Sequence, residues 1–295
     1  LDNVYNEDLK DRIQGVVSAK FDVNDHLLFT GKSGMDYIIR DGVRHAARGA
    51  QAIAAGLGNY AHNTSKSTIW NSDILGTYKT NVVGIGINAS LGANYRSEFG
   101  SSIGVSGNDE KTPDFYRISN YKNSYSSDYS WKKNVYSFYG LAELSYGGFF
   151  YFDATLRNDN SSALPSDNNS YWYHSENASL LFSKLFGIES KWFNMGKLRA
   201  SYATVGNDTG PYRTQSVYNV NQTPTLDYTV ASIPGSLPAI DLKPEHSTSW
   251  EVGMELGFFQ NRINLDVTYY ETLTTDQIMA VPISGTSGFS SKVVN

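Results

Sequence analysis

The sequence contains no cysteine among its 295 residues, which excludes disulfide bonds, thiol nucleophiles, thiolate zinc sites and iron–sulfur clusters. No uninterrupted apolar run approaches the roughly 18 residues of a membrane-spanning helix, and the N-terminus lacks the basic and apolar pattern of a signal peptide. There is no block of Lys or Arg, and the formal net charge is −5. An α-helical membrane protein is therefore excluded, and no nucleic-acid partner is expected.

The residues that are abundant point to strands and turns. The chain has 21 Tyr and 26 Gly but only 8 Pro, a balance that favours β-structure over helices. The aromatic content of 14% is too high for a disordered chain. A mean hydropathy of −0.38 fits a soluble protein. It also fits a transmembrane β-barrel, because barrel strands alternate lipid-facing apolar residues with lumen-facing polar ones.

The clearest pattern lies in residues 250–270, where apolar and polar residues alternate on both sides of an interruption at 260–261. This alternation predicts a β-hairpin. A loop at 260–261 places Met254 opposite Val267 and makes one face of the hairpin wholly apolar.

A second hairpin is predicted in residues 138–157, with a Gly-Gly pair at the turn. A two-residue loop would mix apolar and polar residues on each face. A three-residue loop through 147–149 instead places Leu144 opposite Phe152 on an apolar face, so the sequence favours the longer loop.

Six further segments complete a set of ten predicted strands: residues 12–22, 26–40, 67–79, 83–107, 176–186 and 196–206. Their connections alternate in length. Short ones are expected at 23–25, 80–82, 147–149 and 259–262, a moderate one at 187–195, and long ones at 41–66, 108–134, 159–175, 207–245 and from 274 onward. An alanine-rich segment, residues 45–58, is expected to form a short surface helix in the first long loop. This alternation indicates an antiparallel transmembrane β-barrel with short periplasmic turns and long extracellular loops.

Aromatic clusters near the predicted strand ends agree with this fold. In a barrel they would form girdles at the two membrane interfaces, whereas in a soluble β-protein they would be core residues. The clusters are Tyr136, Phe138 and Tyr139; Tyr171, Trp172 and Tyr173; Trp192 and Phe193; and Tyr269 and Tyr270.

No catalytic or metal-binding motif is convincing. Residues 100–104 match the Gly-x-Ser-x-Gly pattern of esterases, but Ser102 lies in strand-like sequence with no helix after it. The five histidines (His26, His45, His62, His174 and His246) show no metal-binding spacing, so each is expected in a loop or at an interface. The Asn- and Asp-rich triplets at 158–160 and 167–169 are better explained by turns than by calcium binding. We therefore predict no enzymatic activity and no cofactor or metal.

Two pairs of acidic residues are expected to face each other across the hairpins, Glu143 with Asp153 and Glu255 with Asp266. Like charges directly opposite each other in a sheet are unfavourable, so water, a cation or a nearby Lys or Arg must screen them. A wet barrel lumen explains these pairs better than glycosidase catalysis.

Four segments resemble the SusC/RagA family of TonB-linked outer-membrane proteins. They are YFDATLRNDNSSALPSDNNSYWY at 151–173, KLRASYATVGNDTGPY at 197–212, the long segment that begins LKPEHSTSWEVGMELGFFQNRINLDVTYYETLTTDQ at 242, and PDFYRISN at 113–120. The resemblance implies that residues 1–295 are about ten strands of a larger barrel of about 22 strands, in the cell outer membrane of Bacteroidota. Motif residues taken from the family belong to the barrel framework: Arg157, Asn158, Pro244, Glu245, Glu251 and Arg262.

The resemblance also implies a function. Family members import oligosaccharides or peptides, are coupled to TonB-ExbB-ExbD through an N-terminal region, and pair with a SusD-like surface lipoprotein. A plug domain, a TonB box and the C-terminal barrel strands are missing from this sequence, so we expect an internal barrel fragment that contacts outer-membrane lipid. The alternatives are a passive porin-like or adhesive barrel and a soluble β-rich binding domain. No ligand-binding residue is assigned, although Tyr121, Tyr125 and Tyr129 of the expected 108–134 loop are candidates for ligand contact.

Overall fold

The computed structural model describes residues 4–50, 57–188, 190–215, 217–222 and 229–295. Most of these residues form one antiparallel sheet of ten strands, in which each strand pairs with its neighbour in the order β1-β2-β3-β4-β5-β6-β7-β8-β12-β13. The strands of this sheet are β1 (Val4–Asp22), β2 (Leu27–Arg48), β3 (Leu57–Val82), β4 (Ile85–Glu110), β5 (Tyr121–Tyr146), β6 (Phe150–Ser161), β7 (Ser170–Leu180), β8 (Phe193–Asn207), β12 (Glu245–Phe258) and β13 (Ile263–Thr275).

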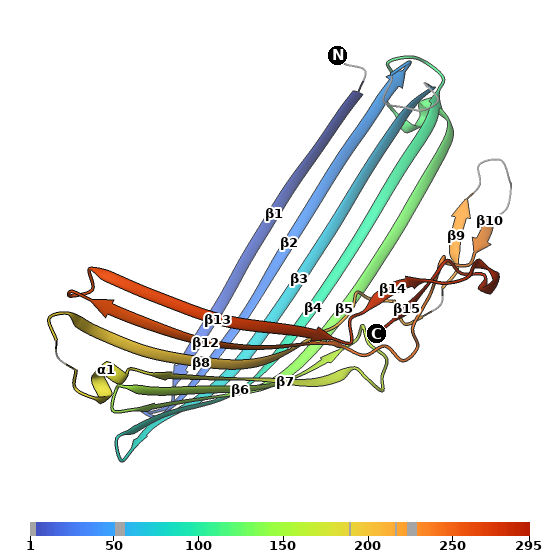
Figure 1. Ribbon diagram of the computed structural model, residues 1–295. Helices are drawn as coiled ribbons and strands as arrows, with labels where there is room; N and C mark the ends of the chain where they lie inside the picture. The colour runs from blue at the N-terminus through green and yellow to red at the C-terminus, as the bar shows by residue number, and fades with distance from the viewer. Residues whose placement is uncertain (1–3, 51–56, 189, 216, 223–228) are drawn as a thin grey trace.

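The sheet is curved and open. Figure 1 shows the long strands β1–β5 running away from the shorter strands β6–β8, β12 and β13, so that the sheet is strongly bent. Strands β1 and β13 form its two edges and do not pair with each other. A sheet that curves in this way without closing has the form of a barrel wall.

The two ends of the sheet differ. One end, which we call the turn end, carries the connections at 23–26, 83–84, 147–149, 181–192 and 259–262. The other, the loop end, carries residues 49–50, 111–120 and 162–169, the described residues between β8 and β12, and the residues after β13. This confirms the predicted alternation of short and long connections.

Smaller elements gather at the loop end. Strands β11 (Ser236–Leu237), β14 (Met279–Pro282) and β15 (Ser291–Val294) form a three-stranded sheet, and β9 (Asn219–Gln222) pairs with β10 (Thr229–Ser232). A small hydrophobic core lies beneath this sheet, where Leu242 is fully buried against Leu164, Tyr171, Ala239 and Val293. The 3-10 helices are η1 (Ile118–Asn120) and η2 (Gly285–Ser287).

A short α-helix, α1 (Phe182–Leu185), lies in the turn between β7 and β8. Neither α1 nor the two 3-10 helices of the described residues has the length and apolar character that crossing a membrane requires.

Both predicted hairpin registers are confirmed. Met254 pairs with Val267 across β12 and β13, and Leu144 pairs with Phe152 across β5 and β6. The turn at 147–149 begins with two glycines in the left-handed region, as a three-residue loop requires. All ten predicted strands are present in the main sheet.

Three predicted loops are wrong in extent, because the strands run further than expected. Most of the expected 41–66 loop is paired strand in β2 and β3, and the expected 108–134 loop contains the first half of β5. The 159–175 loop is also shortened by the ends of β6 and β7. Apolar and polar residues do not alternate regularly along these strand extensions, so hydrophobic alternation does not reveal them.

Two helix assignments also require correction. The expected helix at 45–58 is strand at 45–48 and at 57–58, and residues 51–56 lie outside the described part of the chain. Conversely, residues 182–185, which were expected to continue a strand, form α1. The ladder between β7 and β8 ends at the pair Leu180–Leu198, and the chain then turns so that the ring of Phe182 covers Gly196.

Candidate functional site

The two faces of the sheet differ sharply in chemistry. On β12, Val252 and Met254 point to one face, which we call the apolar face, and Glu251 and Glu255 point to the other, the polar face. The pairing of neighbouring strands extends the apolar face across the whole sheet, through Phe21, Phe29, Ile74, Leu91, Phe138, Phe152, Leu180, Leu198 and Val267. Many of these side chains are exposed, for example Leu91 at 77% and Phe138 at 66%. A continuous band of this kind is the lipid-facing surface of an outer-membrane barrel.

The aromatic clusters contribute to this band only in part. Tyr136, Phe138 and Trp172 point to the apolar face, as girdle residues do. Tyr139 and Tyr173 point to the polar face, because consecutive strand residues alternate. The expectation that whole clusters form girdles is therefore corrected to alternate members.

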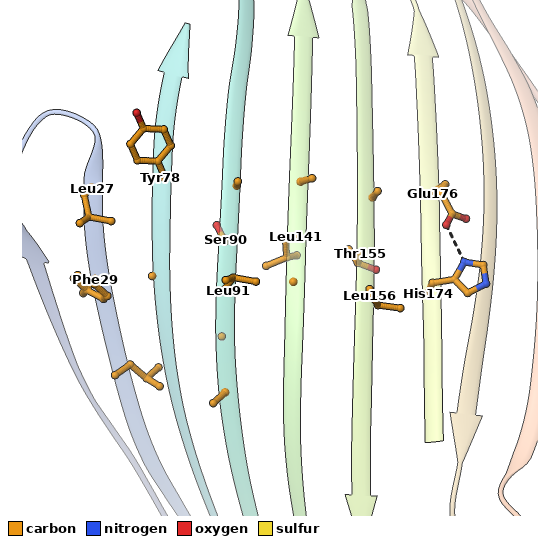
Figure 2. A pocket seen from close by; sticks show the side chains of 18 residues that line it. Leu27, Phe29, Tyr78, Ser90, Leu91, Leu141, Thr155, Leu156, His174 and Glu176 are labelled. Atoms are coloured by element: carbon orange, nitrogen blue, oxygen red, sulfur yellow. Dashed lines mark hydrogen bonds and ion pairs between the residues drawn. The ribbon is translucent and has the colours of Figure 1, made fainter. Parts of the chain in front are cut away.

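A groove of about 1120 Å³ crosses the apolar face over β2–β7. Gly76, Gly140 and Ala142 have little or no side chain, so they leave space above the sheet and add no polar side-chain atoms. Figure 2 shows His174 and Glu176 at one end of the groove. The His174 Nδ1 and a Glu176 carboxylate oxygen lie 2.8 Å apart. These two polar side chains lie on the apolar face. His174 is on a strand and not in a loop, as are His45, His62 and His246.

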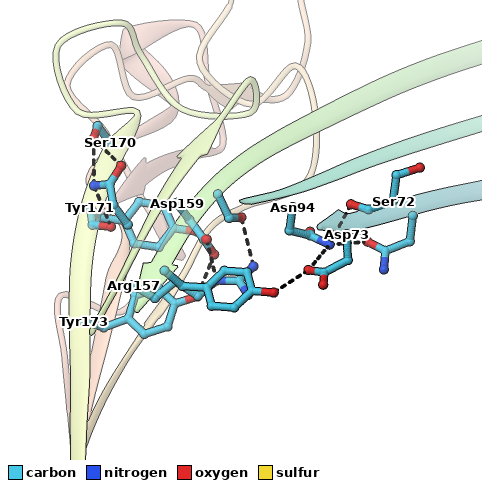
Figure 3. A network of polar contacts seen from close by, with 12 residues as sticks. Ser72, Asp73, Asn94, Arg157, Asp159, Ser170, Tyr171 and Tyr173 are labelled. Carbon is cyan, nitrogen blue, oxygen red and sulfur yellow. Dashed lines mark hydrogen bonds and ion pairs between the residues drawn. The ribbon is translucent and has the colours of Figure 1, made fainter. Parts of the chain in front are cut away.

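The polar face carries a connected network around Arg157 of β6, shown in Figure 3. The guanidinium donates to Asp159 at 2.7 Å and to the Ser137 hydroxyl at 2.8 Å, while its central carbon lies 5.6 Å from the centre of the Tyr139 ring. The Tyr173 hydroxyl donates to the other oxygen of Asp159 at 2.7 Å. Asp159 therefore binds partners on β6 and β7.

The same network continues toward β3. The Tyr139 hydroxyl donates to Asp73 at 2.7 Å, and the Asn94 amide lies within 3.4 Å of the same carboxylate. Strands β3 to β7 are thus linked through polar side chains on one face. This arrangement stiffens a hydrated wall and presents no activated nucleophile.

The predicted screening by a cation is present at one of the two pairs of apposed acids, and the other pair has a neutral amide as its partner. Glu255 lies opposite Asp266, and Arg199 binds Asp266 at 2.7 Å. Glu143 lies opposite Asp153 and accepts a 2.9 Å hydrogen bond from the Asn88 amide. Both pairs point to the polar face, as a wet lumen predicts.

Polar contacts also tie the loop end together. Asp208, beyond β8, binds Lys133 of β5 at 2.5 Å and accepts a hydrogen bond from the Ser161 hydroxyl of β6. Glu110 is 1% exposed and accepts a hydrogen bond from the Arg48 backbone N–H at 3.0 Å. These contacts hold the loop-end segments against the long strands.

The other residues singled out from the sequence are found as follows. Ser102 lies within β4 and donates to Asn63 at 2.9 Å. Residues 158–160 belong to β6, so their expected turn role is wrong, whereas 167–169 lie in the connection to β7. In the described ranges no three His, Asp or Glu side chains are grouped as metal ligands would be.

The three tyrosines proposed for ligand contact lie on β5 and not in a loop. Tyr125 and Tyr129 are exposed, but Tyr121 is buried at 3% and donates to the Asn59 carbonyl at 3.2 Å. Of the residues taken from the family motif, Glu245 has a clear structural role, because it accepts hydrogen bonds from the Ile278 backbone and the Asn207 amide.

Comparison with known proteins identifies relatives of this fold. The family model described as TonB dependent receptor-like, beta-barrel matches residues 2–295. TonB-dependent receptor P3 of Formosa agariphila is 30% identical over 173 residues, which are 57% of this chain and 17% of that protein. TonB-dependent receptor P26 of the same organism is 29% identical over 177 residues, which are 59% of this chain and 18% of that protein.

A solved structure of the RagAB peptide transporter matches the fold with a TM-score of 0.86 and 23% identity, over 99% of this chain and 33% of that one. The chain thus spans a third of that transporter chain and 17–18% of the two curated relatives.

Proposed function

Because the chain belongs to the family of TonB-dependent receptor β-barrels, as its SusC/RagA-like segments predict, we propose that it forms part of the wall of a larger receptor that imports a nutrient across the outer membrane. In this proposal the apolar face contacts lipid and the polar face lines the import pathway. The plug, the TonB box and the remaining strands belong to other parts of the receptor.

The observation that carries this proposal is that the sheet is open and that its two faces differ in chemistry. Strands β1 and β13 leave two unpaired edges, and the apolar face exposes many large side chains. Unpaired edges and a wide apolar surface favour aggregation in water. Further strands that close the barrel would pair both edges, and the bilayer would cover the apolar surface.

The substrate in this proposal is an oligosaccharide, with a peptide as the second possibility. The polar face offers Tyr, Asn and Ser groups that hydrogen-bond to hydroxyls, and several aromatic rings that can stack on a sugar. The fold similarity to the RagAB peptide transporter is the reason for proposing a peptide as the second possibility. The proposed partners are a SusD-like surface lipoprotein at the loop end and TonB-ExbB-ExbD on the periplasmic side.

Energy coupling separates this proposal from a passive porin-like or adhesive barrel. The test compares uptake of a fluorescent oligosaccharide and a fluorescent peptide by cells that make the whole receptor, with and without functional TonB. Uptake that disappears without TonB, while surface binding persists, is expected. Uptake that continues unchanged without TonB would establish a passive barrel.

A further inference from the structure

A groove on the polar face lies beyond the apolar band, toward the loop end. It has a volume of about 340 Å³ and crosses four strands, β2 to β5. We call it the four-strand groove. Two successive cross-strand rows form it: Arg40, Ser65, Ser102 and Tyr129 in one row, and Ile38, Ser67, Gly100 and Trp131 in the next.

On β5, these rows lie on the loop-end side of the apolar band. Trp131 precedes the outward-facing Tyr136 on β5, and the outward residues before Tyr136, such as Lys132 and Asn134, are polar. Trp131 is an even number of residues from Tyr139, so it shares the polar face. The four-strand groove therefore lies toward the loop end of the proposed import pathway.

One wall of the groove is aromatic. A methyl group at Gly100 would collide with the Trp131 indole, so this ring lies against the backbone of β4, and it lines the groove. Tyr129 stands beside it and is 57% exposed. Within the described part of the chain, the Trp131 N–H and the Tyr129 hydroxyl make no hydrogen bond.

The floor between the walls is made of small polar side chains. Ser65, Ser67 and Ser102 lie between Arg40 and the aromatic wall, and Ser102 already donates to Asn63. Their hydroxyls are short and leave space above the sheet. A flat ligand with several hydroxyl groups matches such a floor.

The opposite wall is cationic. Arg40 pairs directly with Lys10 of β1, an arrangement of like charges that is unfavourable without an anion. The nearest inward acid on β2, Asp36, is taken by Arg12 through two hydrogen bonds of 2.7 and 2.8 Å. Asp8, diagonal to Arg40, forms no ion pair with it in the described residues.

The acid near the aromatic wall is paired with a cation. Glu98, one row below Trp131, is bound by Arg96 at 2.7 Å. Arg40 lines the groove without an ion-pair partner in the described residues, with Lys10 opposite it and the carboxylate of Asp8 diagonal to it, so its guanidinium can bind a carboxylate or a sulfate.

We infer that the four-strand groove binds a saccharide that carries carboxylate or sulfate groups. The ring stacks on Trp131 and Tyr129, because the polarised C–H groups of a sugar are attracted to the negative face of an aromatic ring. The acidic group meets Arg40 and Lys10, and the serine floor receives the hydroxyls. This inference rests on the proposed import function and specifies the class of its substrate.

The test measures binding by calorimetry to the purified whole receptor in detergent. The probes are hexagalacturonate, a sulfated carrageenan hexasaccharide, neutral cellohexaose and a hexaglutamate peptide. We expect at least one acidic saccharide to bind about tenfold more tightly than cellohexaose and hexaglutamate. Arg40→Gln and Trp131→Ala should each weaken that binding about tenfold.

Matched controls lie on the opposite face of the same strands. Lys132→Gln removes an exposed cation next to Trp131, and Phe99→Ala removes an exposed ring next to Gly100. Both should leave binding unchanged. Barrel folding of every variant is checked by its resistance to SDS without heating.

Three results would overturn the inference: no binding of either acidic saccharide, equal or tighter binding of cellohexaose or hexaglutamate, or acidic-saccharide binding that survives both Arg40→Gln and Trp131→Ala. Import is assayed separately in cells. A receptor that imports neutral oligosaccharides through TonB would keep the proposed function and lose this inference.

Discussion

The guanidinium of Arg199, on β8, donates a 2.7 Å hydrogen bond to Asp266, on β13, although strand β12 lies between them. It reaches that far because Gly253 of β12 has no side chain, and a methyl group there would collide with the guanidinium stem. Arg199 therefore joins three strands on the polar face and neutralises an acid that would otherwise face Glu255 alone.

Gly253→Val should break this bridge. The new side chain has to displace Arg199 from a filled position, and overpacking of this kind costs about 1–3 kcal/mol. Denaturant unfolding of the whole receptor in detergent measures the loss. Gly31→Val is the matched control, because nothing lies within 4 Å of a methyl group at Gly31. Equal stability of the two variants would contradict the bridging role.

The loss of stability caused by a charged substitution should depend strongly on the face of the sheet that carries it. Leu91→Arg should destabilise the barrel by about 2–4 kcal/mol, because it places a cation among lipid chains. Asn88→Arg, on the same strand but on the polar face beside Glu143, should have little effect. Unfolding in lipid vesicles gives both values. A similar cost for both variants would show that the two faces do not have the assigned surroundings.

The network around Arg157 predicts different roles for two neighbouring tyrosines. Tyr173→Phe removes the hydrogen bond to Asp159 and should cost about 1.5–3 kcal/mol, as expected for a bond to a charged group. Tyr171→Phe serves as the comparison, because the Tyr171 hydroxyl makes no hydrogen bond in the described residues. If Tyr171→Phe were as harmful as Tyr173→Phe, packing and not the hydrogen bond would explain the effect.

His45 predicts a pH dependence at the loop end, outside the membrane. Its ring stacks on Tyr116 at 3.6 Å and on Tyr5 at 5.1 Å, and burial lowers its pKa. The folded state therefore favours the neutral ring. The stabilisation is present above the unfolded pKa of about 6.5 and is lost as the pH falls through that range.

Hydrogen exchange of β2 near His45, corrected for the intrinsic pH effect, should show weaker protection at pH 5 than at pH 7.5. His45→Phe keeps the stacked ring without the titrating nitrogen and should abolish the difference. A pH effect that persists in His45→Phe would assign it to another group.

The sequence predicted the parts of the fold in which one face is apolar. Alternation around Met254 and Leu144 set both the strands and their register, because a one-residue shift would turn every apolar side chain to the polar face. The strand extensions were missed because they lack a regular apolar face. Asp41 and Thr64, for example, are both polar and form a hydrogen bond with each other across β2 and β3. Nothing local marks these segments as strands.

The long-range contacts were also beyond prediction. Strand β11 pairs with β15 across more than fifty residues, and Asp208 reaches Lys133 and Ser161 through the fold alone. The four-strand groove has the same origin. Arg40, Ser102 and Trp131 are distant in sequence and meet only through the register of β2 to β5.

The central claim is that alternate residues of this sheet face lipid and a hydrated lumen. Single cysteines at residues 153–156 of β6, in a cysteine-free form of the whole receptor, can carry spin labels after reconstitution into lipid vesicles. Labels at Ala154 and Leu156 should collide mainly with oxygen, which dissolves in lipid, and labels at Asp153 and Thr155 mainly with a water-soluble nickel chelate. An equal preference at all four positions would contradict the assignment of this chain to a transmembrane barrel wall.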